Sequence, residues 1–319
     1  MSNASVGKRF LALSGGVGGA KLALGLTHVL SPDELQIVVN TGDDFEHLGL
    51  TICPDLDTLL YTLSGLANPK TGWGRAGETD TFMKSLKTLG GDTWFFLGDG
   101  DLALHVERTR RLHAGQSLSQ VTNELANKMG ITVPIIPMTN DSVRTVVETP
   151  DGPLPFQHYF VREQCAPTAL GFQFAGAADA VPHPGFTGAL HHSGLAAIIV
   201  CPSNPFVSVD PILALPGIRR QLGARKAPLV AVSPIVGGTA LKGPAAKMMG
   251  ELGLEVSALS VARHYGSLLD GFVLDQADAA LEADVAALGP KVLVTNTVMT
   301  SLEDRIKLAN DVIEFSQSI

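Results

Sequence analysis

The sequence contains few of the residues that mark disulfide scaffolds or zinc proteins. Cysteine occurs three times in 319 residues, as Cys53, Cys165 and Cys201, with no CxxC pair and no zinc-type spacing to histidine. This sparse, odd count excludes a disulfide-stabilised fold and favours a reducing compartment. We therefore expect a cytoplasmic protein.

Basic residues are also scarce, and long hydrophobic runs are absent. The 23 Lys and Arg residues are outnumbered by 31 Asp and Glu residues, which gives a formal net charge of −8. A nucleic-acid surface needs a basic stripe, so we expect no nucleic-acid partner. No apolar run reaches the roughly 18 residues of a membrane span, and Met1–Lys8 is short and polar, unlike a signal peptide. The composition, 45% hydrophobic and 17% charged, indicates an ordered globular protein without a membrane partner.

Apolar strands alternate with helices along most of the chain. Strands are predicted at 9–13, 37–40, 196–200, 229–232, 271–274 and 292–294, and helices at about 20–30, 56–66 and 117–129. Residues 131–137 are typical of an edge strand. The alternation predicts an α/β fold with a doubly wound, mostly parallel sheet. We expect a single large domain over 9–319, with an antiparallel or irregular subdomain inserted at about 145–190.

Four carboxylates follow the strand at 37–40 within fifteen residues: Asp43, Asp44, Asp55 and Asp57. Open α/β sheets place their ligands at the carboxyl ends of such strands. Neighbouring acids repel one another unless a cation or hydrogen-bond donors neutralise them. The cluster therefore predicts a divalent metal, with Mg²⁺ suited by its preference for oxygen ligands, and a phosphorylated substrate that the metal bridges.

A glycine-rich loop joins the first predicted strand to the next helix. It contains Gly15, Gly16, Gly18 and Gly19, and Lys21 follows. Backbone N–H groups at the start of a helix can converge on an anion, and glycine permits the close approach of a phosphate. The loop matches neither the Walker pattern nor the GxGxxG dinucleotide fingerprint. It favours a nucleotide or pyrophosphate site; the alternative is a tight turn without a ligand.

Small polar residues also follow two later strands, where they could contact a base, ribose or phosphate. They are Ser203 and Asn204 after the strand at 196–200, and Ser233, Gly237 and Gly238 after the strand at 229–232. Ordinary turns favour the same residue types, so each loop alone is weak evidence. Three such loops at three strand ends together favour a site.

Two further segments carry polar groups. Asp99, Gly100 and Asp101 precede His105 and Arg108, and a helix would present Asp101, His105 and Arg108 along one side. A packed histidine and a solvated arginine are the alternative. The second segment contains Asn140, Asp141 and Arg144. A guanidinium beside an amide and a carboxylate can grip phosphate or orient a heterocycle.

Six motifs in one order together resemble a known family. They are SGGVGGAKL, NTGDDFEHLGL followed by ICPDLDTLLYTLSG, LGDGDLALHVERT, PMTNDSVRT, CPSNPFVSVDPILALPGI and SPIVGGTALKGPAAKMM. Over roughly residues 9–315 the chain resembles the 2-phospho-L-lactate transferase family of deazaflavin coenzyme (F-420) biosynthesis. The resemblance implies a Rossmann-like core with an additional smaller α+β subdomain, usually in a homodimer.

The resemblance also implies a reaction and a division of the site. A phospho-organic acid passes, with a metal, from a guanosine diphosphate-linked donor to the deazaflavin precursor Fo, and GMP leaves. Asp43 and Asp57 are implied for the metal and acceptor region, and either could accept the hydroxyl proton. We expect Asp57→Asn to abolish turnover with little loss of stability. The acceptor side would contain Asp57, Asp99, Gly100, Asp101, His105 and Arg108. The nucleotide side would contain the glycine loop with Lys21, the 140–144 segment, Ser203, Asn204 and the 233–238 loop.

One position departs from the family pattern. Many relatives carry arginine between the aspartates of the GD-x-D turn, where this chain has Gly100. An arginine there would recognise the groups in which phospholactate, phosphoenolpyruvate and phosphoglycerate differ, so the donor acid stays open.

Two alternatives come from other classes. A related family of regulatory proteins shares the GGxGG start and binds nucleotide sugars without turnover. A nucleotidyl- or phosphotransferase acting on another alcohol is the second alternative. The PDLDT and GD-x-D segments favour the deazaflavin transferase, because a passive nucleotide binder has little need for an acidic cluster beside the phosphates.

Overall fold

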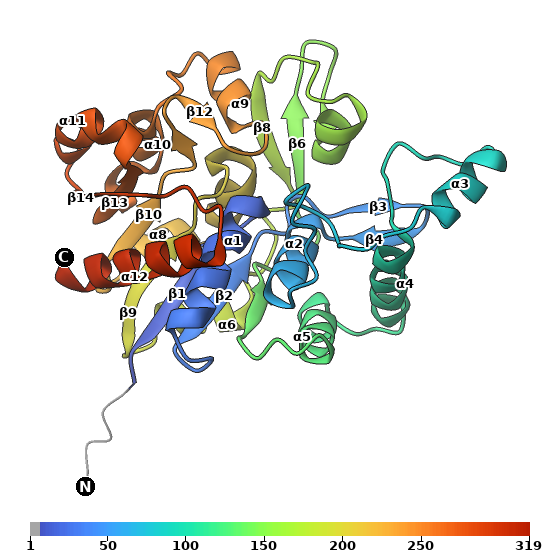
Figure 1. Ribbon diagram of the computed structural model, residues 1–319, viewed down its shortest axis with the longest axis horizontal. Coiled ribbons are helices and arrows are strands. Elements are labelled where there is room, and N and C mark those ends of the chain that lie inside the picture. Colours follow the sequence, from blue (N-terminus) through green and yellow to red (C-terminus); the bar gives the residue numbers. More distant parts are fainter. Residues whose placement is uncertain (1–6) are drawn as a thin grey trace, which may run out of the picture.

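The fold is built around one seven-stranded parallel sheet (Figure 1). The computed structural model describes residues 7–319; Met1–Val6, part of the segment judged unlike a signal peptide, lie outside the described residues. The strands follow the order β14 (Lys291–Thr295), β13 (Gly271–Asp275), β10 (Leu229–Val232), β9 (Leu195–Val200), β1 (Arg9–Ser14), β2 (Leu35–Val39) and β5 (Ile135–Pro137). All neighbouring strands pair in parallel. The predicted strands are confirmed, with β5 at an edge.

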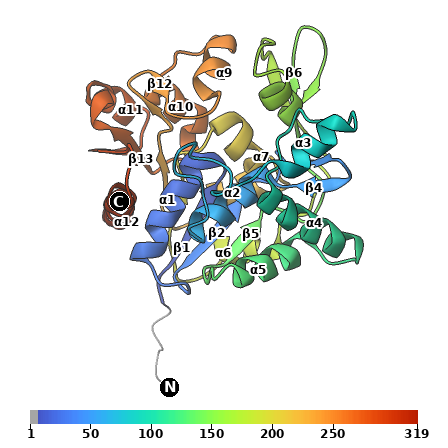
Figure 2. The same cartoon turned by 45° about the vertical axis from the view of Figure 1, so that its right-hand side comes forward.

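Helices cover both faces of this sheet (Figures 1 and 2). Along β1, Phe10 and Ala12 join one hydrophobic cluster while Leu11 and Leu13 join the other, because successive strand residues point to opposite faces. The first cluster includes side chains of α1 (Gly16–Val29), α2 (Pro54–Leu63), α5 (Leu118–Lys128) and α12 (Leu302–Ser318). The second includes α6 (Pro184–Leu190), α7 (Asp210–Leu213), α8 (Ile218–Gly223), α9 (Ala245–Glu251), α10 (Ala258–Tyr265) and α11 (Glu282–Ala286). The doubly wound α/β fold is therefore confirmed.

The other elements are small sheets, two helices and short helical turns. The sheets are β3 (Phe45–His47) with β4 (Leu50–Ile52), β6 (Arg144–Glu148) with β7 (Leu154–Pro155) and β8 (Gly171–Ala175), and β11 (Ile235–Val236) with β12 (Thr239–Ala240). The helices are α3 (Thr81–Thr88) and α4 (Asp99–His113). The short turns are η1 (His158–Arg162), η2 (Pro205–Val209), η3 (Gly266–Leu268) and η4 (Gln276–Leu281).

The segment predicted as an insertion, about 145–190, contains the antiparallel sheet β7–β6–β8 and helix α6. Its buried side chains Val147, Phe156 and Tyr159 belong to the same hydrophobic cluster as Leu11 of β1. Lys247 of α9 also donates a hydrogen bond to the Tyr159 hydroxyl at 3.3 Å. The segment therefore shares the core of the main sheet.

Three local features differ from the sequence prediction. Helix α1 begins at Gly16, four residues before the predicted start, so Gly18 and Gly19 lie in its first turn. The β3–β4 hairpin and α3 were not predicted. The hairpin turns at Leu48 and Gly49, whose φ values of 53° and 72° belong to a primed turn. Leucine rarely adopts a positive φ, so the sequence carries no clear signal for this turn.

The strand order places a topological switch point between β1 and β9. After β1 the chain adds β2 and β5 on one side, and then β9, β10, β13 and β14 on the other. Ligands of open α/β sheets bind at the carboxyl ends of strands at such a point. The glycine loop after β1 and the Cys201–Ser208 loop after β9 flank it. The sheet topology therefore brings two of the predicted loops together.

Among the helices within residues 7–319, none is long and apolar enough to cross a membrane. Cys53, Cys165 and Cys201 are buried free thiols.

Candidate active site

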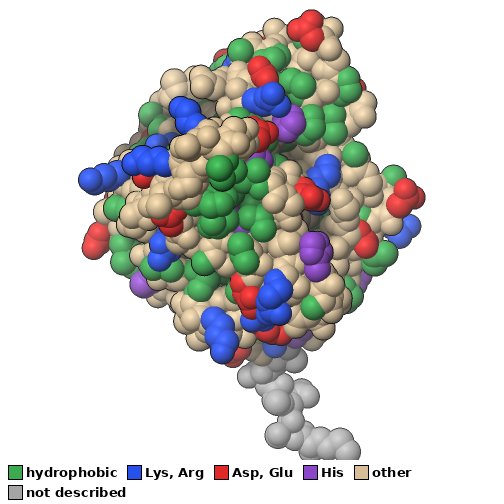
Figure 3. Space-filling view, turned by 90° about the vertical axis from the view of Figure 1, so that its right-hand side faces the viewer, with side chains coloured by type: hydrophobic (Ala, Val, Ile, Leu, Met, Phe, Trp, Pro, Cys, Tyr) green, Lys and Arg blue, Asp and Glu red, His purple; other side chains and the backbone are tan. Residues whose placement is uncertain are grey.

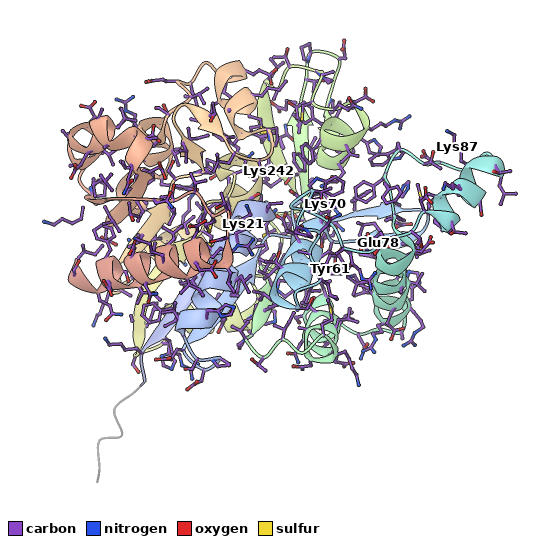
Figure 4. The ribbon with its side chains drawn as sticks, in the orientation of Figure 1. Lys21, Tyr61, Lys70, Glu78, Lys87 and Lys242 are labelled. Atoms are coloured by element: carbon purple, nitrogen blue, oxygen red, sulfur yellow. The ribbon has the colours of Figure 1, made fainter. Side chains whose placement is uncertain are left out.

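A cavity of about 690 Å³ opens at the carboxyl ends of the central strands. It is lined by many of the predicted site residues: Gly15, Gly16, Gly18, Lys21, Asp43, Asp55, Asp57, Asp101, His105, Ser203, Asn204 and Ser233. Figure 4 shows Lys21, Tyr61 and Lys242 around this central region, while Lys87 of α3 lies far out at the side. The structure thus brings residues from five separate segments of the sequence to one cavity.

The glycine loop is shaped by packing as much as by space for a ligand. Gly16 has a φ of +64°, which favours glycine. A Cβ atom on Gly18 would overlap the backbone carbonyl of Pro202, and one on Gly19 would lie 2.6 Å from the hydroxyls of Ser14 and Ser203. The glycines therefore let α1 pack directly against the loop after β9.

Two amides of the glycine loop are already hydrogen-bonded within the protein. Gly15 N donates to Ser203 Oγ at 3.1 Å, and Gly16 N donates to Asp55 Oδ1 at 2.8 Å. An anion at this helix start would therefore meet the next amides, those of Val17 and Gly18, both of which line the cavity.

Two lysines add positive charge on the side of the cavity where α1 begins. Lys21 Nζ donates to the carbonyl of Met299 at 3.0 Å, and Lys242 Nζ donates to the carbonyl of Thr71 at 3.2 Å. Burial, followed by the charges of Arg305 and Lys242, lowers the pKa of Lys21. Positively charged lysines that repel one another in this way are stabilised by an anion bound between them. We define the phosphate wall as Val17, Gly18, Lys21 and Lys242.

Asp43 and Asp55 are neighbouring buried acids on the cavity surface. Asp55 accepts from Asn40 Nδ2 at 2.9 Å besides Gly16 N, but burial still raises its pKa to about 6. Asp43 Oδ1 is buried without a hydrogen-bond partner. Burial and the charge of Asp55 raise the pKa of Asp43 well above its ordinary value. A cation beside these two acids would neutralise both.

Asp57 and Asp44 are held differently. Arg108 NH1 donates to Asp57 Oδ2 at 3.1 Å, and Arg108 NH2 donates to Asp57 Oδ1. Asp44 does not line the cavity; its Oδ1 is buried without a partner, and burial, opposed by Arg144, raises its pKa to about 7.

The four acids do not form a preformed metal cage. Within residues 7–319, no group of three or more His, Cys, Asp or Glu side chains is arranged to hold a metal ion. Mg²⁺ commonly binds through one or two carboxylates together with substrate phosphates. The free oxygen of Asp43 beside Asp55 fits that pattern, whereas Asp57 is engaged by Arg108. Mg²⁺ stays a prediction, with Asp43 and Asp55 as the acids placed to hold it.

The predicted helical arrangement of Asp101, His105 and Arg108 is present on α4, facing α2. His105 Nε2 lies 3.0 Å from Asp101 Oδ2, and the Tyr61 hydroxyl donates to Asp101 Oδ1 at 2.5 Å. Burial alone would raise the pKa of Asp101, but its contact with His105 and its hydrogen bond from Tyr61 lower it. Burial and the charges of Asp57 and Asp101 raise the pKa of Tyr61, so its hydroxyl stays protonated.

Several predicted acceptor residues lie outside the cavity. Asp99 accepts from the amides of Thr81 and Phe82, and so fixes the start of α3. Gly100 packs against Glu78, whose Oε2 accepts from its amide at 2.7 Å, and a Cβ atom there would overlap the guanidinium of Arg75. A guanidinium therefore lies beside position 100 although the residue itself is glycine.

Five predicted nucleotide-side residues are also placed elsewhere. Asn140 Oδ1 accepts from Ser119 N at the start of α5, and Asp141 accepts from Val181 N. Arg144 NH1 donates to the carbonyl of Val143. Gly237 and Gly238 form the β11–β12 turn, with φ values of 56° and 72°. None of these five residues lines the cavity. Local hydrogen bonds and turn geometry account for the polar residues and glycines at these positions.

The sequence interpretation missed an aromatic wall and a loop. We define the aromatic wall as Trp73, Trp94, Phe95, Phe96, Phe156 and Phe160, all of which line the cavity. From the side of α3 and α4, hydrophobic side chains gather near the centre of the surface (Figure 3). The loop Thr297–Thr300 after β14 also lines the cavity. The three aromatic residues at 94–96 were the available signal in the sequence. Because apolar and polar residues do not alternate there, the pattern did not indicate which side chains face a cavity.

Comparison with known proteins identifies the family. A family model described as 2-phospho-L-lactate transferase CofD matches residues 10–303. A phosphoenolpyruvate transferase of Kitasatospora aureofaciens is 40% identical and the alignment covers 98% of each chain. A 2-phospho-L-lactate transferase of Methanococcoides burtonii is 39% identical, with 97% of this chain and 100% of that protein covered.

Solved structures support the fold. Two crystal structures of a Bacillus halodurans protein, one described as a member of the UPF0052 family, match with TM-scores of 0.60 and 0.62 at 16% identity. They cover 97% of this chain and 99% and 100% of their own. The family match and the relatives confirm the resemblance seen in the motifs. This chain is a transferase that belongs to the 2-phospho-L-lactate transferase CofD family.

Proposed function

We propose that this transferase moves a phospho-organic acid from a guanosine diphosphate-linked donor to the deazaflavin precursor Fo and releases GMP, in coenzyme F-420 biosynthesis. The acid is of the 2-phospholactate, phosphoenolpyruvate or phosphoglycerate type. The observation that carries the proposal is that the phosphate wall and the aromatic wall line the same cavity. The relatives named for phosphoenolpyruvate and 2-phospho-L-lactate, at 40% and 39% identity, favour neither donor over the other.

The phosphate wall suits the diphosphate of the donor. Val17 and Gly18 amides lie at the positive end of α1, and Lys21 and Lys242 add positive charge. Ser233 and Asn204 also line the cavity and would lie near the nucleoside.

The aromatic wall suits the tricyclic ring of Fo. Planar heterocycles stack on aromatic side chains with little dependence on hydrogen bonding. Trp73 and Phe96 are 58% and 51% exposed, so their ring faces are available to a ligand rather than used in the core. Asp57, Tyr61, Asp101 and His105 lie on the same cavity and would face the ribityl chain of Fo.

The proposed reaction forms one phosphorus–oxygen bond and breaks another. A ribityl hydroxyl oxygen attacks the β-phosphorus of the donor, and the bond from that phosphorus to the oxygen of GMP breaks. Asp57, whose carboxylate accepts from Arg108, would orient the hydroxyl and accept its proton. Asp43 and Asp55 would hold Mg²⁺, which supplies neutralisation of charge on the phosphoryl oxygens. We also propose a cytoplasmic homodimer on the family resemblance; a monomeric mass by light scattering would contradict the dimer.

The test is a reconstituted reaction. The protein is incubated with Fo, Mg²⁺ and each of the three guanylylated phospho-acids, and GMP and phosphorylated deazaflavin are identified by mass. We expect both products in equal amounts with at least one donor, and their loss with EDTA. No product with any donor, and no Fo binding by fluorescence, would overturn the proposal. Binding of nucleotide sugars without Fo affinity would instead support the regulatory class.

A further inference from the structure

A continuous set of polar side chains connects a buried arginine to a tyrosine hydroxyl in the cavity. Arg108 lies behind the cavity surface and is only 1% exposed. Its NH1 contacts Asp57 Oδ2 at 3.1 Å and His105 Nδ1 at 3.3 Å. His105 Nε2 lies 3.0 Å from Asp101 Oδ2, and Asp101 Oδ1 receives the Tyr61 hydroxyl at 2.5 Å. We name these five residues the polar chain.

The chemistry of the groups constrains the direction of the contacts in the polar chain. Arg108 NH1 also donates to the carbonyl of Thr51 at 3.3 Å, and arginine has donors and no acceptor, so a hydrogen bond at the Arg108–His105 contact requires His105 Nδ1 to accept. His105 then carries its proton on Nε2, which lies 3.0 Å from Asp101 Oδ2 but is not aligned as a hydrogen bond in this structure. An ionised Asp101 only accepts, so the Tyr61 hydroxyl donates its hydrogen bond to Asp101 Oδ1. The lone pairs of Tyr61 are left to face the cavity.

The walls of the cavity consequently differ in hydrogen-bond polarity. The phosphate wall offers N–H donors from Val17, Gly18, Lys21 and Lys242. The side formed by Asp57, Tyr61 and Asp101 offers acceptor oxygens. A phosphate or carboxylate has no proton to give, so it is disfavoured beside Tyr61. A hydroxyl or N–H group is favoured there.

We propose that Tyr61 is a substrate-contacting residue that accepts a hydrogen bond from a hydroxyl of the acceptor's ribityl chain, and that Arg108 is a positioning residue which sets this polarity through His105 and Asp101. The inference rests on the proposed function and deepens it. It explains how one cavity keeps two polar substrates in different places: the polyol hydroxyls go to the acceptor side, and the phosphates go to the donor side.

The first test removes the Tyr61 oxygen. In Tyr61→Phe we expect the KM for Fo to rise about fivefold to tenfold, the loss of one hydrogen bond, while the KM for the donor stays within about twofold. Tyr159→Phe is the matched control, because the Tyr159 hydroxyl bonds to Lys247 away from the cavity. An unchanged KM for Fo in Tyr61→Phe, or an equal rise for the donor, would overturn the assignment. Failure of the wild-type protein to bind Fo would instead contradict the proposed function itself, and with it this role of Tyr61.

The second test measures which ring nitrogen of His105 carries the proton. Nitrogen NMR of the labelled protein at neutral pH should show His105 protonated on Nε2, and protonation on Nδ1 would overturn the inference. His105→Gln keeps one donor and one acceptor, whereas His105→Leu keeps neither. We expect the KM for Fo to rise less in His105→Gln than in His105→Leu. Equal values in the two folded variants would show that the polarity of His105 is not used.

Discussion

Arg108 of α4 donates to both carboxylate oxygens of Asp57 on α2, and both side chains are buried. The two residues are 51 positions apart in the sequence, so the pair joins two helices behind the cavity. Burial alone would lower the pKa of Arg108, but the charge of Asp57 raises it above its ordinary value. The expectation that Asp57→Asn costs little stability is therefore revised, because the variant leaves a buried guanidinium without its counter-charge.

Arg108→Ala should lower the free energy of unfolding by about 3–5 kcal/mol, because it leaves the Asp57 carboxylate buried and unpaired. Arg110→Ala is the control on the same helix: Arg110 pairs with Glu107 while its side chain is 64% exposed, and its loss should cost less than about 1 kcal/mol. Urea unfolding of the two variants makes the comparison. Equal losses would show that the buried pair does not stabilise the fold.

Asp44→Asn should stabilise the protein in a pH-dependent way. The folded pKa of Asp44 is raised from 3.8 to about 7, so its contribution to stability is fully present below about pH 4 and is lost as the pH rises through 7. The asparagine variant keeps this contribution because its side chain does not ionise. Its free energy of unfolding should exceed that of the wild type at pH 8 by at most about 4 kcal/mol. Thermal unfolding in EDTA between pH 4 and 8 measures the difference. A gap that is constant with pH would contradict the assignment.

Gly18→Ala should disturb the phosphate wall, since its Cβ would overlap the carbonyl of Pro202 and force α1 away from the loop after β9. We expect a loss of about 1–3 kcal/mol in the free energy of unfolding and weaker donor binding. Gly188→Ala on α6 is the control, because no atom lies within 4 Å of the added Cβ. It should be neutral or stabilising by up to about 1 kcal/mol. A harmless Gly18→Ala would show that the close approach is not needed.

Phe96→Ala should weaken Fo binding by roughly tenfold or more while leaving donor binding unchanged, because stacking on one ring contributes about 1–3 kcal/mol. The half-exposed ring contributes little to the core, so the melting temperature should barely move. Leu89→Ala is the matched control, being 85% exposed and outside the cavity lining. Fluorescence titration of Fo gives the result. The same affinity in wild type and Phe96→Ala would remove this ring from the acceptor site.

The sequence was sufficient for the parts of the fold that depend on local pattern. Apolar strands alternating with helices predicted the doubly wound sheet, and the ends of β1 and β9 predicted where the cavity lies. The pairing of Asp57 with Arg108 could not be predicted from the sequence, because no local pattern links residues 51 positions apart. The Leu48 turn was missed because leucine is uncommon at positive φ.

The candidate site was predicted best where strand ends supply its residues. Ser203, Asn204 and Ser233 line the cavity as expected, but Asn140 and Asp141 do not, since polar residues in turns serve the backbone as often as a ligand. The aromatic wall is assembled from three separated segments, so no single stretch of sequence revealed it.

The central claim is that the phospho-acid, and not the nucleotide, moves to Fo. The most direct measurement uses a guanosine diphosphate-linked donor with radioactive phosphorus at the β position, together with Fo and Mg²⁺. All transferred label should appear in the deazaflavin product and none in GMP. Label in a free phospho-acid, together with a guanylylated Fo, would contradict the claim and show nucleotidyl transfer instead.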